Sequence, residues 1–342
     1  MAYTTIDDPS AFFNTVLTTG AGAGSYTGVG FQPDFLWFKR RDSSGPHFLI
    51  DSTRGSSKYL ASESGASETT DATFLTSIDS DGWTGGSGFY GSPATLATWN
   101  WKANGGTTSS NTDGSITSTV QANTTAGFSI VTWTGDANNT STVGHGLGKV
   151  PKIIIMKNRS DTADWCVCGS FSPFGINKRT PLNGTGAISS PSDILEAIPT
   201  TTLFQPGNSN DSNGSGDNML AYCFADIEGY SKFGSYTGNG SNDGAFVYTG
   251  FRPAWIMVKR ITSGAGWSIL DAKRNEFNPV DKLLQANVSN QEFTPYDVDF
   301  ISNGFKWRTT DSTHNQSGST FIYMAFAEHP FVSSKGVPVT AR

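Results

Sequence analysis

Short apolar runs alternate along the whole chain with polar turns rich in Gly, Ser, Asn and Asp. Three of these runs share one pattern, in which a proline is followed by five mostly apolar residues and then a lysine: Pro33 to Lys39, Pro151 to Lys157 and Pro253 to Lys259. The apolar residues do not alternate with polar ones, so each run predicts a strand covered on both faces. Proline donates no ladder hydrogen bond and suits the first position of such a strand.

Further landmarks recur at similar distances from each proline. A Thr-Gly pair lies upstream, a second apolar strand ("HFLID", "WCVCG" or "WSILD") follows the lysine, and an aromatic run closes each segment. This self-similarity predicts three divergent β modules of about a hundred residues each. The predicted organisation is an N-terminal arm (1–11), module 1 (12–103), a polar linker or long surface loop (104–126), module 2 (127–229) and module 3 (230–342).

A polar turn sequence follows each lysine, and we expect a hairpin there that is symmetric about the middle of the turn. That symmetry sets each lysine opposite the residue that ends the next strand. The predicted pairs are Lys39 with Asp51, Lys157 with Gly169 and Lys259 with Asp271. A cross-strand Lys/Asp pair stabilises a hairpin by roughly 0.2–1 kcal/mol. Module 2 keeps its strands without the aspartate, so we interpret the prolines, lysines and aspartates as structural.

The remaining patterns indicate an all-β protein. Asp-Gly and Asn-Gly turns predict further hairpins at 76–86 and 299–308, and module 2 has no clear equivalent. About seven short strands per module predict a β-sandwich or jelly roll. Short helical segments are expected at 7–13, where Asp8 can cap and Pro9 begin a turn, and at 191–198.

Composition excludes several classes. The chain has 342 residues with only 15% charged residues, a net charge of −6 and no Lys/Arg run, so no nucleic-acid partner is expected. Its apolar runs are too short to span a membrane, and "MAYTTIDDPS" is no classical signal peptide. The three cysteines are expected to be buried thiols, and no cofactor is expected.

Catalytic patterns are weak. The four histidines are scattered without metal-ligand spacing. Carboxylate pairs of the kind that glycosidases use occur at Asp79 with Asp81 and at Asp297 with Asp299, but both lie beside predicted turns, where Asp is common. Asp79 and Asp81 are also a weak calcium candidate, because oxygen-rich β loops suit that ion. Four tryptophans near turns are the candidates for exposed ligand contacts: Trp83, Trp165, Trp267 and Trp307.

Several blocks resemble a family of marine bacteriophage proteins, common in phages of cyanobacteria. They are "AYTTIDDPSAFFNTVL", "GVGFQPDFLWFKRRD", "VGHGLGKVPKIIIMKNRS", "YSKFGSYTGNGSNDGAFVYTGFRPAWIMVKR" and the closing "FIYMAFAEHPF". The stretch "VLTTGAGAG" departs from the family's usual Tyr-Thr-Gly-Asn-Gly pattern, in a loop. Such proteins are described as tail-fibre-like or virion structural proteins, and the resemblance implies no catalytic residues.

The resemblance implies a non-enzymatic protein of the virion surface, most readily a tail-fibre or tail-tip component for host attachment. Its expected partners are other virion proteins, further copies of itself with a trimer favoured, and a host surface glycan or protein. A head-decoration (capsid cement) protein is the first alternative. A carbohydrate-binding or glycan-cleaving protein is the second.

Overall fold

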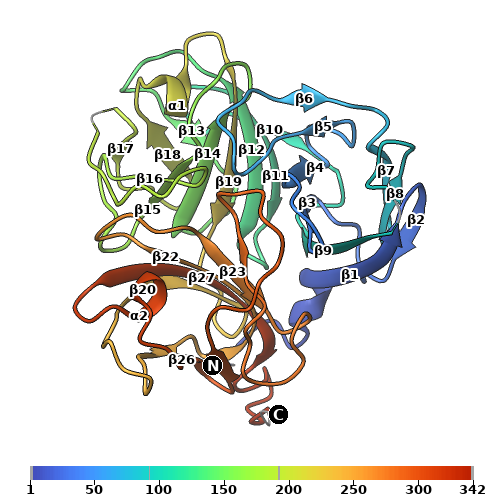
Figure 1. Cartoon of the computed structure of the whole chain (residues 1–342). Coiled ribbons are helices and arrows are strands. Elements are labelled where there is room, and N and C mark those ends of the chain that lie inside the picture. Colours follow the sequence, from blue (N-terminus) through green and yellow to red (C-terminus); the bar gives the residue numbers. More distant parts are fainter. Residues whose placement is uncertain (1–2, 92, 192, 340–342) are drawn as a thin grey trace.

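The computed structural model describes residues 3–91, 93–191 and 193–339. Strands dominate the described chain, which confirms the all-β prediction. Helix is confined to the 3-10 turn η1 (Pro9–Ala11) and the four-residue helices α1 (Asn210–Asn213) and α2 (Ser312–Asn315) among these residues. Figure 1 shows the strands gathered into several antiparallel sheets.

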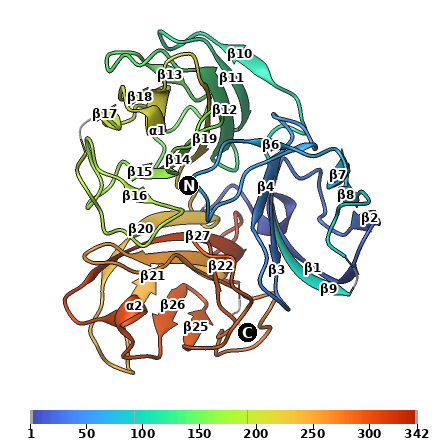
Figure 2. The ribbon, with the colours of Figure 1, turned by 45° about the horizontal axis from the view of Figure 1, so that its top comes forward.

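Three large sheets have the same order of strands, and Figure 2 separates them by colour. Sheet I has the order β1 (Phe13–Ala21), β9 (Ala94–Trp101), β3 (Phe35–Arg40), β4 (Phe48–Asp51). Sheet II has seven strands, in the order β10 (Ser109–Asn111), β11 (Ser118–Asn123), β12 (Phe128–Thr134), β19 (Asn218–Phe224), β14 (Ile153–Asn158), β15 (Cys166–Gly169), β16 (Thr180–Pro181), and the order shared with the other sheets begins at β12. Sheet III has the order β20 (Ser231–Thr237), β27 (Thr320–Pro330), β22 (Phe251–Arg260), β23 (Ser268–Asp271), β24 (Leu284–Gln285).

A three-stranded sheet accompanies each large sheet. Small sheet I is β2 (Gly24–Thr27), β8 (Gly82–Gly85), β7 (Leu75–Asp79). Small sheet II is β13 (Val143–Gly144), β18 (Leu203–Pro206), β17 (Leu195–Ala197). Small sheet III is β21 (Phe246–Tyr248), β26 (Gly304–Trp307), β25 (Val298–Ile301). The short strands β5 (Lys58–Tyr59) and β6 (Thr69–Thr70) pair with each other.

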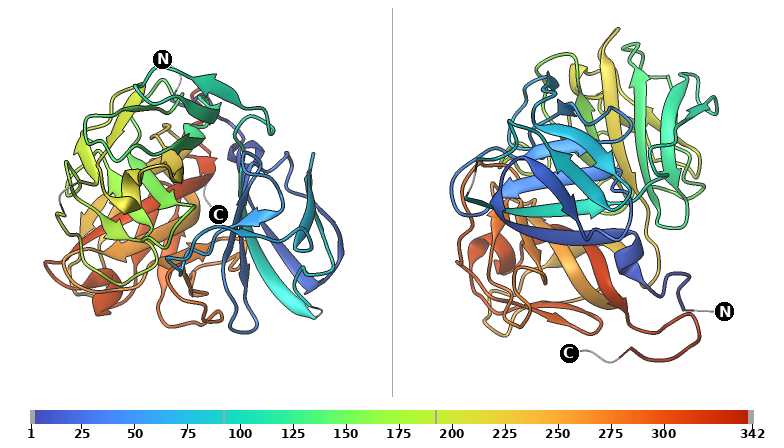
Figure 3. Two further views of the ribbon diagram at one scale, coloured as in Figure 1. Left: turned by 90° about the horizontal axis from the view of Figure 1, so that it is seen from above. Right: turned by 90° about the vertical axis from the view of Figure 1, so that its right-hand side faces the viewer.

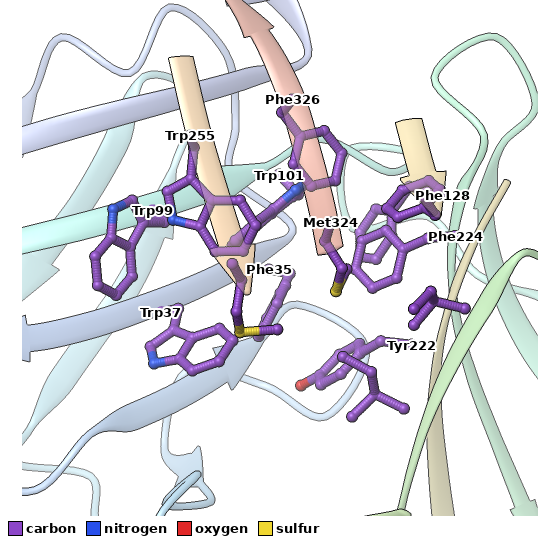
Figure 4. Close-up of a cluster of buried hydrophobic side chains, with 14 of the residues drawn as sticks. Phe35, Trp37, Trp99, Trp101, Phe128, Tyr222, Phe224, Trp255, Met324 and Phe326 are labelled. Carbon is purple, nitrogen blue, oxygen red and sulfur yellow. The ribbon is translucent and has the colours of Figure 1, made fainter. Parts of the chain in front are cut away.

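The central strands β3, β14 and β22 are buried on both faces, as their non-alternating sequences predict. One face of each packs on the neighbouring small sheet, as Phe38 packs edge-on against Trp83 in sheet I. The other faces of all three large sheets meet in one shared core. Figure 4 shows this core, in which Phe35, Tyr222 and Trp255 come from three different sheets.

The stretch 104–126, expected as a linker or surface loop, contains two strands. They are β10 (Ser109–Asn111) and β11 (Ser118–Asn123), and β11 pairs with the edge of β12 that faces away from β19. Its composition is polar because β10 is largely exposed and β11 is only partly buried, and a strand near a sheet edge needs few apolar residues.

Of the remaining local predictions, the cap and the two hairpins are confirmed and one helix is wrong. Asp8 caps η1 by accepting a hydrogen bond from the Ser10 amide, as expected. Both predicted hairpins form, as β7–β8 and β25–β26. The helix expected at 191–198 is wrong, because Leu195–Ala197 is strand β17; residue 192 lies outside the described residues. β17 and β18 supply the hairpin of module 2 that the sequence did not reveal.

Candidate functional site

The predicted prolines lie at or near the start of the central strands, and each aspartate ends the strand that follows. Pro33 and Pro151 each precede a central strand by two residues, and Pro253 sits at a bulge inside β22. The predicted lysine–aspartate register is wrong. Asp51 lies opposite Phe35, and Asp271 lies opposite Trp255, a shift of four residues from the expected partners.

Module 2 shows the same shift, since Gly169 lies opposite Ile153 and not Lys157. The physical reason is that the connecting segments are not symmetric turns. In sheet I, β3 continues along β9 to Arg40, whereas its pairing with β4 stops at Phe38.

The three lysines are buried and bind backbone carbonyls. Lys39 Nζ donates to the oxygens of Arg40, Gly45 and Ser289 at 3.1, 2.9 and 3.0 Å. Lys157 Nζ makes the corresponding three bonds, including one to Gly65 O, and Lys259 Nζ donates to Ala265 O at 2.6 Å. Burial lowers the pKa of Lys39 and Lys157 to about 8 and that of Lys259 to about 7. Each lysine therefore fastens the loop that follows its own strand.

The same loops bind the next sheet. The amides of Gly45, Ala163 and Ala265 donate to Ser289 O, Gly65 O and Thr185 O, at 2.8, 2.9 and 3.0 Å. Three equivalent side chains repeat the contact from the start of the second strand. They are His47, bonded to Gln285 O, Trp165, bonded to Ala61 O, and Trp267, bonded to Pro181 O. The contacts close a ring, so the chain segment that carries each large sheet is hydrogen-bonded to the segments of both others.

Buried ion pairs reinforce two of the three junctions. At the I/II junction Asp51 binds Arg54 at 2.5 Å, and Glu68 binds both Arg54 and Arg159 at 2.9 Å. Tyr222 Oη donates to Asp51 at 2.8 Å. Burial raises the pKa of Glu68, but the guanidinium groups of Arg159 and Arg54 outweigh it and lower that pKa to about 2.

The III/I junction repeats the arrangement with other residues. Asp271 binds Arg274 at 2.6 Å, and Glu292 binds Arg274 at 3.1 Å and Arg41 at 2.9 Å. Trp99 Nε1 takes the place of the tyrosine and donates to Asp271 at 3.0 Å.

The II/III junction is apolar at the equivalent positions. The backbone bond from Glu68 N to Arg159 O is matched here by Ile188 N to Ile261 O at 3.0 Å. Gly169 stands where the other sheets have an aspartate, and Met324 where they have the donor Tyr222 or Trp99. Carboxylate and donor have thus been lost together, which leaves no buried charge without its partner.

The four tryptophans expected as exposed ligand contacts are buried, so that expectation is wrong. Trp83, Trp165, Trp267 and Trp307 have no exposed surface. Trp165 and Trp267 make the inter-sheet bonds described above, and Trp83 and Trp307 pack between a small sheet and its large sheet. A large aromatic ring next to a turn can still point inward, and position along the chain did not reveal this.

The calcium candidates serve the backbone. The Asp81 carboxylate accepts the amides of Gly28 and Gly30 at 3.1 and 2.6 Å, and these bonds lower its pKa. Asp79 accepts the hydroxyl of Thr84 at 2.8 Å. Within the described ranges, no group of three or more His, Cys, Asp or Glu side chains is placed to hold a metal ion.

Other reactive side chains are also built into the fold. The thiols of Cys166, Cys168 and Cys223 are buried and unpaired, as expected, and burial raises their pKa values. His47 accepts a hydrogen bond from Trp37 Nε1 at 2.8 Å, and burial lowers its pKa to about 3. Among the residues described, no helix is long and apolar enough to cross a membrane.

An open cleft of about 410 Å³ lies at the III/I junction. One wall is η1 and the start of β1, and the other comes from β22, β27 and the segment after β23. The right-hand view of Figure 3 shows β1 and η1 on the outside of the molecule, beside the chain that follows β27. The residues that line the cleft include acidic, basic and small side chains. They are Asp8, Ser10, Phe13, Asn14, Thr15, Ala254, Ala272, Lys273, Glu276, Ala327, Glu328 and His329.

A second exposed feature is the aromatic patch, which we define as Phe246 and Tyr248 on the edge strand β21. Their exposed fractions are 47% and 54%, while Val247 between them is buried. Lys306 on β26 lies opposite Phe246 and pairs with Asp243 at 2.5 Å. Alternation along a strand places both rings on the outer face of small sheet III, beside this ion pair. The sequence signal was present as "FVY" but was not recognised.

Residues 8–330 match the family described as "Domain of unknown function (DUF7483)". The match covers nearly the whole chain, and the protein therefore belongs to this family. Comparisons with curated proteins and with solved structures find no match.

Proposed function

We propose that this chain is a non-enzymatic structural protein of the bacteriophage virion surface, acting at a tail fibre or tail tip in host attachment. The resemblance of its sequence blocks to marine phage proteins supports the virion assignment. The aromatic patch is the observation that supports adhesion. Exposed Phe246 and Tyr248 beside a Lys306–Asp243 pair combine apolar faces with polar hydrogen-bonding groups. Protein and glycan surfaces are both recognised by such combinations.

The way the titratable groups are used supports a non-enzymatic role. The lysines of the central strands bind carbonyls, and Asp51, Glu68 and Asp271 lie in buried ion pairs between sheets. These contacts hold three sheets in fixed positions. A rigid body with binding residues on its rim suits a particle part that is exposed to the medium without repair.

Attachment to the particle is proposed to occur through other virion proteins and through copies of the chain, with a trimer favoured. The edge strands β2 and β21 are largely exposed and belong to small sheets whose edges are available for pairing. Multi-angle light scattering gives the mass in solution, and a trimer is the expected result.

The adhesion proposal is tested by binding the purified, fluorescently labelled protein to host cells. Replacing Phe246 and Tyr248 by Ala is expected to reduce cell binding by about 10-fold or more, because exposed aromatic anchors carry much of an interface's energy. The matched control is Phe277→Ala, an aromatic residue that is 74% exposed and outside the patch. Undiminished binding by the double variant contradicts the proposal.

A further inference from the structure

β1 and β12 occupy equivalent places, but only β12 has a partner on its outer edge. Phe13 of β1 pairs with Trp101 of β9, and Phe128 of β12 pairs with Phe224 of β19. These two pairs occupy equivalent positions in sheets I and II. In sheet II the chain's own β11 adds to β12. In sheet I, β1 is the terminal strand.

The backbone of β1 is arranged to accept a further strand. Lys102 N donates to Phe12 O at 2.9 Å, as Ala225 N donates to Gly127 O at 2.8 Å in sheet II. Backbone groups alternate in direction along an antiparallel strand. Those of Phe13 and Thr15 therefore point away from β9, as those of their equivalents in β12 point toward β11.

Thr15 supplies a second observation at the same edge. It lines the cleft and is only 6% exposed. Within the described residues its hydroxyl has no hydrogen-bond partner. A buried hydroxyl without a partner is uncommon and is satisfied when a ligand brings one.

The opposite wall of the cleft is equivalent to the surface that receives β11. At the I/II junction Gln121 of β11 bonds to Ser52 and Thr53 at 2.9–3.3 Å and to the amides of Asn104 and Gly106 at 3.2 and 3.0 Å. Counting from Asp51 and Asp271, the equivalents of Ser52 and Thr53 in sheet III are Ala272 and Lys273. Ala272 and Lys273 both line the cleft. The open volume therefore lies where β11 lies at the other junction.

The charges of the lining favour a basic occupant. The carboxylates of Asp8, Glu276 and Glu328 outnumber the ammonium group of Lys273. Glu328 is already paired with Arg252, whereas Asp8 and Glu276 lie on the exposed rim. A copy of this chain, which carries a net charge of −6, is the less complementary occupant.

We propose that the cleft is a strand-docking site, in which an extended segment of a different protein pairs with β1 at Phe13 and Thr15. The segment takes the place that β11 takes on β12, and it carries Lys or Arg at the position equivalent to Gln121. This inference goes beyond host attachment and does not depend on it, because it rests on the open edge of β1, the cleft beside it and the Thr15 hydroxyl.

The probes are four fluorescein-labelled decapeptides with the sequence of residues 115–124, SITSTVQANT, with Gln, Lys, Arg or Glu at the position of Gln121. Fluorescence anisotropy with the whole protein measures their binding. We expect Lys and Arg to bind most tightly and Glu least, with at least about 10-fold between the extremes. Absence of binding by all four peptides to the folded protein overturns the proposal.

The decisive variant is Thr15→Pro, which removes an outward N–H that pairing within the sheet does not use. Thr19→Pro is the matched control, since it is on the same strand with the same outward direction but outside the cleft. We expect Thr15→Pro to abolish peptide binding and Thr19→Pro to leave it unchanged, with circular dichroism showing both folded. Glu276→Lys, at an exposed position, is expected to reverse the preference of Lys over Glu.

Two outcomes contradict the site. Equal binding by the two proline variants would place the peptide elsewhere. A dimer of the wild-type protein that Thr15→Pro dissociates would assign the cleft to a second copy of the chain and overturn the proposed heterologous segment.

Discussion

Lys39, Lys157 and Lys259 are ammonium groups enclosed by carbonyl oxygens, in places where water is excluded. Burial penalises their charged form, and their pKa values fall to about 8, 8 and 7. Lys39 and Lys157 each use all three N–H donors on carbonyl oxygens, and loss of one proton leaves two of these bonds to hold the side chain. The lysines of the three repeated Pro-to-Lys segments therefore stabilise the loops that follow their strands.

These pKa values predict that stability increases with pH above neutrality. In the unfolded chain a lysine has a pKa of about 10.4, so between about pH 7 and pH 10 the unfolded state binds more protons than the folded state. The free energy of unfolding, measured by urea titration, should be larger at pH 9 than at pH 7. Lys259→Met should make that dependence shallower. Equal pH dependence in both proteins would show that Lys259 keeps an ordinary pKa.

Glu68 provides a second prediction at this scale. Glu68→Gln leaves Arg159 and one side of Arg54 without a carboxylate partner inside the I/II junction. We expect a loss of about 3 kcal/mol in the free energy of unfolding, as for other broken buried pairs. Asp42→Asn, which removes the exposed pair with Arg40, is the control and should cost less than about 1 kcal/mol. Similar losses for both variants would contradict a special role for Glu68.

At the scale of elements, the three junctions are alternative solutions to one packing problem. Two junctions bury a carboxylate with its arginines, and the third packs the half-buried Ile188 beside Ile261, whose carbonyl oxygen accepts the Ile188 amide. Each solution is complete, since an isolated charge at any of these sites would be costly.

A double-mutant cycle tests this equivalence. Ile261→Arg and Ile188→Glu, made singly, should each destabilise the protein by about 2–4 kcal/mol, because each places one unpaired charge in the junction. The double variant should be more stable than the sum of the two losses by at least about 1 kcal/mol, measured by denaturant unfolding. Additive losses would mean that the two positions do not meet as their equivalents do.

Elements were predictable where a local pattern determines them. The central strands, the hairpins of 76–86 and 299–308 and the cap at Asp8 follow from runs, turn dipeptides and capping chemistry. The register of the first hairpin was not predictable, because the lysines bind carbonyl oxygens instead of the aspartates. These oxygens lie in the loop after each lysine and, for Lys39 and Lys157, also at Ser289 and Gly65, far along the chain. The cleft was not predictable either, since it depends on which sheet edge remains without a strand.

One signal in the sequence could have led to the junctions. Asp51 and Arg54 recur as Asp271 and Arg274, three residues apart in both cases, and an arginine two residues after the lysine recurs as Arg41 and Arg159. Pairing each aspartate with the arginine three residues later, instead of with the lysine across the expected turn, predicts the observed Asp51–Arg54 and Asp271–Arg274 ion pairs.

At the scale of the whole molecule, three sheets share one aromatic core and cannot bury their inner faces separately. We therefore expect one cooperative transition in calorimetry, with equal calorimetric and van't Hoff enthalpies. A protein ending at residue 229 should expose the inner faces of sheets I and II and bind a hydrophobic dye. Separate transitions for the three sheets would contradict a shared core.

The position of the protein on the particle tests the functional account most directly. Antibody–gold labelling of purified phage particles under the electron microscope should place the label at the tail. Label over the head would instead make the chain a capsid-decoration protein. Unlabelled particles, with the antigen shown to be accessible, would contradict the virion assignment altogether.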